Sequence, residues 1–135
     1  MNYSNYRVRK YWGEKQNLFN IFTIWGFGTA CKGDYGIGVI SEFVFSEVTT
    51  VLALRKSMDA AKEVGNVLLE AREIEIMKAS EVFERSWEIF SNQENTGLSF
   101  VDASNLACME MREIRMIATF DKDFLKIGSV EVVNG

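Results

Sequence analysis

The alternation of helical and extended segments from Tyr35 onward constrains the fold of this 135-residue chain most strongly. Four segments repeat apolar residues at the spacing of a helix face, and short runs rich in β-branched residues separate them. The expected helices are 42–55, 58–72, 79–93 and one that begins at Asp102, and the expected strands are 35–40, 73–77, 115–119 and 129–133. Helices that alternate with short strands predict a single layered α/β domain around a parallel sheet.

Each expected helix has an apolar face that should pack inward. The inward residues are Phe43, Val44, Val48, Val51 and Leu52 in the first; Ala61, Val64 and Leu68 in the second; Val82, Phe83, Trp87 and Phe90 in the third; and Ala103, Leu106, Ala107, Met111 and Ile114 in the fourth. Ser41 is a favourable N-cap for the first helix, and residues 92–97 form a polar loop. Cys108, Met109 and Met111 are expected to be packing residues.

The composition excludes several kinds of site. The chain has no histidine, so catalytic triads and histidine-based zinc sites are ruled out, and acid–base chemistry falls to carboxylates, Lys or Tyr. The net charge is −4 and the pI about 4.9, so a contact with nucleic acid needs a local patch or metal ions. Cys31 and Cys108 form no C-x-x-C pattern, which predicts a reduced, cytoplasmic protein.

Residues 1–33 differ from the remainder, because they contain Trp12 and Trp25 and show no period of 2 or 3.6. Basic residues precede the apolar stretch Leu18–Phe27, and Cys31 follows it, in an outline similar to a secretory or lipoprotein signal. The stretch is too short to span a bilayer. An apolar strand and helix of the core is the alternative interpretation, and we expect no membrane association.

Asp102 and Asp121 each stand at the edge of an apolar stretch, nineteen positions apart. One helix plus one strand fills that interval, so both acids are expected at the same end of a parallel sheet, where clustered carboxylates hold Mg²⁺ or Mn²⁺. The alternatives are structural: Asp102 as an N-cap and Asp121 as a turn residue. Asp123 either shares the site or solvates the turn.

Glu47 lies among Val44, Val48 and Val51 on a largely apolar helix. A carboxylate on or near such a face is costly to bury unless something pairs with it. A solvated edge position is the structural alternative, and Glu42 is better explained as a first-turn acid favoured by the helix dipole.

Together these segments resemble the PIN-domain nucleases, in particular the VapC-type toxins of toxin–antitoxin pairs. The resemblance rests on three motifs in order, and it covers about residues 34–133. The motifs are Gly38–Val48 (GVISEFVFSEV), Leu98–Ala103 (LSFVDA) and Ile117–Phe124 (IATFDKDF).

The resemblance implies a three-layer α/β/α fold with an acidic pocket and a Mg²⁺- or Mn²⁺-dependent endoribonuclease activity. Carried over to this chain, Glu47, Asp102 and Asp121 become the catalytic and metal-binding acids, with Asp123 as an auxiliary ligand and Thr119 shaping the site. It also implies a homodimer, an RNA substrate and a VapB-type antitoxin. A catalytically inactive PIN-like module that binds RNA or protein is the alternative.

The chain departs from the family pattern at its first strand, which in the family ends in an Asp. The expected position falls in Arg7–Trp12, which contains no acid, and Asp34 and Glu14 are poor substitutes. Either the N-terminal segment has diverged, leaving a binding module, or residues 1 to about 32 are a translated frameshift or a misassigned start.

Overall fold

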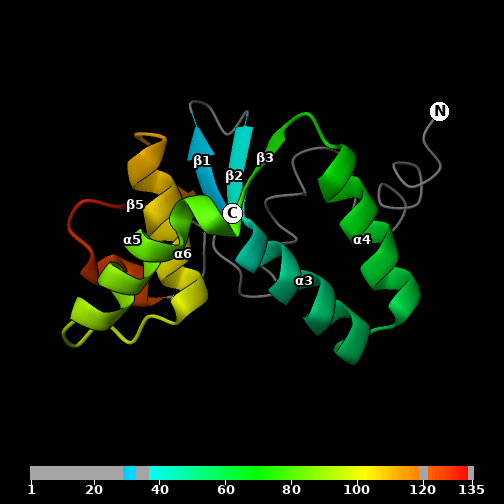
Figure 1. Ribbon diagram of the computed structural model, residues 1–135, viewed down its shortest axis with the longest axis horizontal. Helices are drawn as coiled ribbons and strands as arrows, with labels where there is room; N and C mark the ends of the chain where they lie inside the picture. The colour runs from blue at the N-terminus through cyan, green and yellow to red at the C-terminus, as the bar shows by residue number, and fades with distance from the viewer. Residues whose placement is uncertain (1–28, 33–36, 119–121, 134–135) are drawn as a thin grey trace.

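Two pairs of helices flank a five-stranded sheet in the computed structural model, which describes residues 29–32, 37–118 and 122–133 (Figure 1). The helices are α3 (Glu42–Arg55), α4 (Met58–Glu70), α5 (Ala79–Asn92), α6 (Phe100–Met111) and the short 3-10 helix η1 (Lys122–Lys126). The strands are β1 (Thr29–Lys32), β2 (Ile37–Ser41), β3 (Ile74–Met77), β4 (Met116–Ala118) and β5 (Glu131–Val133). The four predicted helices are confirmed, whereas η1 was not predicted and α6 begins two residues before Asp102.

The sheet has the strand order β3-β2-β1-β4-β5 and is mixed. The pairs β2–β3 and β4–β5 are parallel, as predicted, but the central strand β1 is antiparallel to both β2 and β4. The strand β1 was not among the predicted strands, and its direction makes the sheet mixed rather than wholly parallel. Only residues 33–36 connect β1 to β2, and a parallel neighbour needs a crossover of a dozen or more residues.

The two faces of the sheet carry separate apolar cores, which confirms the three-layer α/β/α fold. Val39 and Ile40 are adjacent in β2 and point to opposite faces, as strand geometry requires. Val39 packs in the core on the side of α5 and α6. The members of this core include Met77, Val82, Leu106, Cys108, Ile117 and Phe124. Ile40 packs in the core shared with α3 and α4, whose members include Val44, Val48, Leu52, Ala61, Val64 and Leu68.

Three hydroxyl or carboxylate groups contact the first turns of α3, α4 and α5. Ser41 caps α3, as predicted, with its Oγ accepting from Val44 N at 3.3 Å, and Ser57 caps α4 in the same way. The N-cap residue of α5 makes no side-chain capping bond, but Glu42 Oε2 accepts from Ala79 N at 3.1 Å. Glu42 thus joins the first turn of α3 to the first turn of α5.

The predicted aromatic face of α5 is wrong in part. Val82 and Ser86 are the buried residues of α5, whereas Phe83 and Trp87 are 53% and 55% exposed. The aromatic rings instead contact one another at the surface: Phe100 lies 5.3 Å from Phe43 and 5.8 Å from Phe83 between ring centroids. We call Phe43, Phe83, Trp87, Phe90 and Phe100 the aromatic surface.

In α6 the predicted packing residues behave unequally. Cys108 and Met109 are buried as predicted, and burial raises the pKa of the Cys108 thiol to about 12, so this residue packs as an inert side chain. Met111 is 42% exposed, because α6 ends at this residue and the chain turns away toward Ile114.

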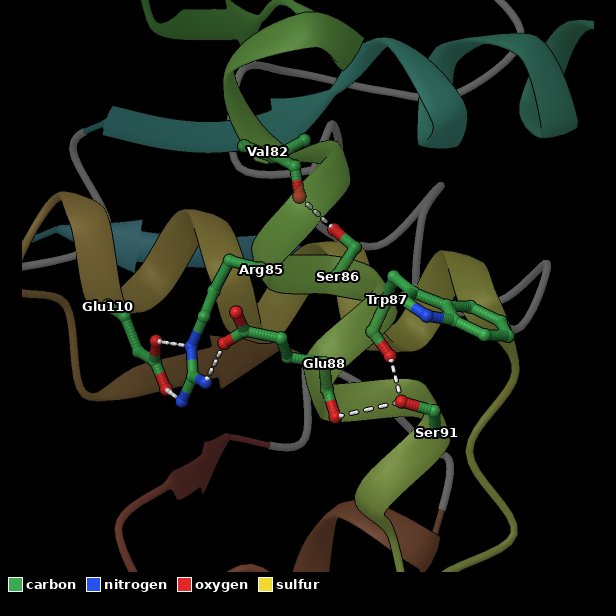
Figure 2. A network of polar contacts seen from close by, with 7 residues as sticks. All are labelled: Val82, Arg85, Ser86, Trp87, Glu88, Ser91 and Glu110. Atoms are coloured by element: carbon green, nitrogen blue, oxygen red, sulfur yellow. Dashed lines mark hydrogen bonds and ion pairs between the residues drawn. The ribbon is translucent and has the colours of Figure 1, made fainter.

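An exposed ion-pair group joins the outer sides of α5 and α6 (Figure 2). Arg85 donates from Nε to Glu110 Oε2 at 2.6 Å and from Nη2 to Glu110 Oε1 at 2.9 Å, and it donates to Glu88 as well. The two helices are therefore held together by a bidentate bond on the outside and by apolar packing on the inside.

Candidate active site

The structure brings together two of the predicted acids, Glu47 of α3 and Asp102 of α6. Glu47 lies in the second turn of α3, and Asp102 is the third residue of α6. Both side chains are half-buried. Burial raises the pKa of the Glu47 carboxyl above its ordinary value of 4.5, and the nearby charge of Asp102 raises it further.

The structural alternative for Asp102 was an N-cap, but the N-cap residue of α6 is Ser99. Ser99 N donates to Asp102 Oδ2 at 3.0 Å, and Asp102 N donates to Ser99 Oγ at 3.1 Å. This reciprocal pair is a capping box. It fixes the orientation of the Asp102 carboxylate through the backbone, and a carboxylate has about four acceptor sites, so capping and metal binding are compatible.

The electrostatics of the pair fit a divalent cation. The charge of Asp102 raises the pKa of Glu47, so the two carboxylates repel each other when both are ionised, and an ion with oxygen-preferring chemistry relieves that repulsion. Within the described residues, no group of three or more Asp, Glu or Cys side chains is placed to hold a metal. The described part of the site is therefore the pair Glu47 and Asp102.

Two predicted site residues, Asp121 and Thr119, lie outside the described residues. The interval between Asp102 and Asp121 does contain one helix, α6, and one strand, β4, as its length predicted. Since β2 and β4 are both antiparallel to β1, they run in the same direction and their carboxyl ends share one edge of the sheet.

Asp123 lies in η1, beside the turn that leads into α6. Lys126 Nζ pairs with Asp123 Oδ1 at 2.9 Å. On the other side, Asp123 Oδ2 is 3.2 Å from the point where a Cβ on Gly97 would stand, and Gly97 has a φ of +72°. The absence of a side chain at Gly97 is therefore what allows Asp123 to approach this turn.

Sequence reasoning missed the polar contact that lies between the two acid-bearing helices. Ser41 Oγ and Ser104 Oγ are 2.8 Å apart, and both serines are fully buried. Ser41 was interpreted only as a cap, and Ser104 was not singled out. The available signal was that Ser104 directly follows Ala103 and stands near Leu106 and Ala107, all of which were predicted to face inward.

Comparison with known proteins agrees with this architecture. The sequence pattern of the PIN domain matches residues 30–130. The chain therefore belongs to the PIN-domain family, the family of nucleases that its motifs predicted.

Among solved structures, the chain is similar to VapC20 of Mycobacterium tuberculosis, a toxin that cleaves the sarcin–ricin loop. The TM-score is 0.61 and the sequence identity 27%, over 72% of this chain and 75% of VapC20. No curated protein matches the chain. The resemblance to a VapC-type toxin is thereby confirmed.

Proposed function

We propose that this protein is an endoribonuclease of the VapC toxin type that depends on Mg²⁺ or Mn²⁺. The observation that supports the proposal is the meeting of Glu47 and Asp102 on a PIN-domain fold, with the charge of one raising the pKa of the other. Two chain positions 55 apart converge here, and each contributes a carboxylate.

In this proposal Glu47 and Asp102 hold the metal ion, with Asp121 as the third ligand and Asp123 and Thr119 in support. The ion supplies positive charge that activates water and neutralises the scissile phosphate. The chain itself contributes orientation: the capping box holds the carboxylate of Asp102, and the half-buried position of Glu47 limits its contact with water. No histidine is required, which agrees with the composition.

The test is cleavage of RNA by the purified protein with Mg²⁺, with Mn²⁺ and with a chelator. A sarcin–ricin loop oligonucleotide is the first substrate, since VapC20 acts on that structure, and total RNA is the second. We expect metal-dependent cuts that disappear in Glu47→Gln. If the wild-type protein cuts neither substrate with either ion, or Glu47→Gln cuts equally well, the ribonuclease proposal is wrong.

A catalytically silent PIN-like module that binds RNA or a protein partner is the second candidate. The observation that favours it is the direction of β1, which is antiparallel to β2 and β4. The family pattern places an acid at the end of a first strand, whereas here the start of β1 lies at the carboxyl edge of β2 and β4. RNA binding without cleavage, measured by gel shift with Mn²⁺ present, would support this candidate.

The partners follow from the same proposal. A VapC-type toxin implies an RNA substrate, a VapB-type antitoxin and a homodimer in the cytoplasm. None of the described helices has the length and apolar character of a bilayer span. The aromatic surface supports a protein contact, because its members Phe83 and Trp87 are largely exposed and exposed apolar patches are typical of interaction sites. Sedimentation velocity of the wild type and of Trp87→Ser tests whether this surface mediates self-association.

A separate measurement tests the signal-like outline of residues 1–31. The intact mass of the purified protein distinguishes a retained N-terminal segment from cleavage between Ala30 and Cys31. We propose that the segment is retained, and a mass that lacks residues 1–30 would instead support export.

A further inference from the structure

A buried chain of hydrogen bonds connects the two helices that carry Glu47 and Asp102. Ser41 precedes α3 and Ser104 lies inside α6, and their Oγ atoms are 2.8 Å apart although the residues are 63 positions apart in sequence. Both side chains have no exposed surface. A contact of this kind between distant, fully buried hydroxyls is maintained by the tertiary structure alone.

The direction of each hydrogen bond follows from counting protons. Ser104 Oγ donates to the carbonyl oxygen of Val101 at 2.6 Å, which uses the one hydroxyl proton of Ser104. Ser41 must therefore donate to Ser104 Oγ, and Ser41 Oγ in turn accepts from Val44 N at 3.3 Å. The result is a single chain that runs from the backbone of α3 through two hydroxyls to the backbone of α6.

The ends of this chain lie close to both acids along the sequence. Val101 directly precedes Asp102, and Ser104 is two residues after it. Ser41 is the N-cap residue of α3, six positions before Glu47. We propose that Ser41 and Ser104 are positioning residues, which fix the separation of Glu47 from Asp102 and thereby set the affinity of the site for a divalent cation. This inference rests on the proposed function.

The chemistry of the contact explains why serine suits these positions. A buried hydroxyl is costly without a partner, so the pair is stable only when α3 and α6 stand at hydrogen-bonding distance. An apolar contact has no preferred direction and tolerates sliding, whereas a hydrogen bond at 2.8 Å does not. Repulsion between the two carboxylates drives the helices apart, and the serine pair opposes that movement.

The chain offers a matched control for testing this proposal. Ser86 of α5 is also fully buried, and its Oγ donates to the carbonyl oxygen of Val82 at 2.5 Å, a bond that stays within α5 (Figure 2). Ser104→Ala and Ser86→Ala therefore remove the same atom from the same kind of environment. Only Ser104→Ala removes a bond between the acid-bearing helices.

We would measure four quantities in wild type, Ser104→Ala and Ser86→Ala. They are the Kd for Mn²⁺ from electron paramagnetic resonance, the kcat and KM for RNA cleavage, and the Glu47–Asp102 carboxyl separation in metal-free crystals. Residues that orient metal ligands typically change affinity 10- to 100-fold, so we expect Ser104→Ala to raise the Kd about tenfold and to lower kcat with KM unchanged. Ser86→Ala should change none of these quantities.

A double-mutant cycle adds a test of the pair itself. If the hydrogen bond is what matters, Ser41→Ala together with Ser104→Ala raises the Kd by less than the product of the two single effects. Fully multiplicative effects would mean that the serines act separately, and the proposal would be wrong.

The outcomes distinguish this inference from the proposed function. Equal Kd values and equal carboxyl separations in Ser104→Ala and Ser86→Ala would overturn the positioning role, whether or not RNA is cut. Mn²⁺ binding without RNA cleavage would overturn the ribonuclease proposal. The positioning role would then be decided by comparing the Kd for Mn²⁺ of Ser104→Ala with that of Ser86→Ala. If the wild type binds no Mn²⁺, the role in setting affinity is overturned.

Discussion

Asp102 combines two roles that conservative substitutions can separate. Its carboxylate completes the capping box of α6, and its charge acts on Glu47. In Asp102→Asn the amide oxygen still accepts from Ser99 N, but the charge is lost. In Asp102→Ala both the acceptor and the charge are lost. The two variants therefore differ in stability, whereas both lack the proposed metal ligand.

The expected magnitudes follow from these contacts. Loss of a capping bond costs about 1 kcal/mol, and loss of an acid from the first turn of a helix costs about 0.3–1 kcal/mol. In Asp102→Asn the second cost is offset by relief of the repulsion with Glu47, so the free energy of unfolding should stay within about 0.5 kcal/mol of wild type. Asp102→Ala should lose about 1 kcal/mol, roughly 4 °C in Tm for a domain of this size.

Asp59 provides the control, because it is an exposed acid in the first turn of α4. Asp59→Asn loses the interaction with the helix dipole without a change at the site, so it should cost about 0.3–1 kcal/mol and leave cleavage intact. The assays are urea denaturation without metal and RNA cleavage with Mn²⁺. Wild-type cleavage by Asp102→Asn, or a loss of stability as large as that of Asp102→Ala, would refute the reasoning.

Three further predictions concern other parts of the molecule. Because the folded-state pKa of Glu47 is raised, the metal-free wild type should lose stability as the pH rises from about 4.5 through that pKa; urea midpoints across this range should show no such loss in Glu47→Gln. Gly97 has a φ of +72°, and a Cβ there would lie 3.2 Å from Asp123 Oδ2, so Gly97→Ala should lower the free energy of unfolding by about 1–3 kcal/mol in thermal unfolding. A Cβ on Gly128 would have no atom within 4 Å, so Gly128→Ala should be nearly neutral. Arg85→Ala should lose only about 0.5 kcal/mol, and less in high salt, because both partners of its bond to Glu110 are largely exposed; a loss above 2 kcal/mol would contradict this.

The helices were predictable where local chemistry and packing agreed. The helix α3 has the predicted bounds, since Ser41 is a strong cap and the apolar spacing continues to Leu52. The start of α6 was placed too late, because both Ser99 and Asp102 favour a helix start and only the capping box shows which one is the cap. Boundaries of this kind depend on a reciprocal contact that a single position does not reveal.

The aromatic surface was not predictable from periodicity. A helical repeat of large apolar residues ordinarily indicates a buried face, and Val82, Phe83, Trp87 and Phe90 satisfy that pattern. In the structure α5 packs through Val82 and Ser86, so the helix is rotated away from its largest side chains. A tertiary contact outweighs the local pattern here, and the exposed rings are then available for a partner.

The acids of the candidate site could be predicted from the sequence, but their arrangement in space could not. The carboxylates of Glu47 and Asp102 converge because α3 starts at the carboxyl end of β2 and packs against α6, which no sequence spacing specifies. The direction of β1 was equally inaccessible, since it follows from the short connection 33–36 to β2. Because β1 is antiparallel to β2 and β4, it starts at the edge of the sheet where these two strands end. In the family pattern the first strand instead ends at that edge, with its Asp. Within the described residues the proposed site has two acids, so we expect the relative placement of Glu47 and Asp102 by α3, α6 and the serines between them to determine its metal affinity.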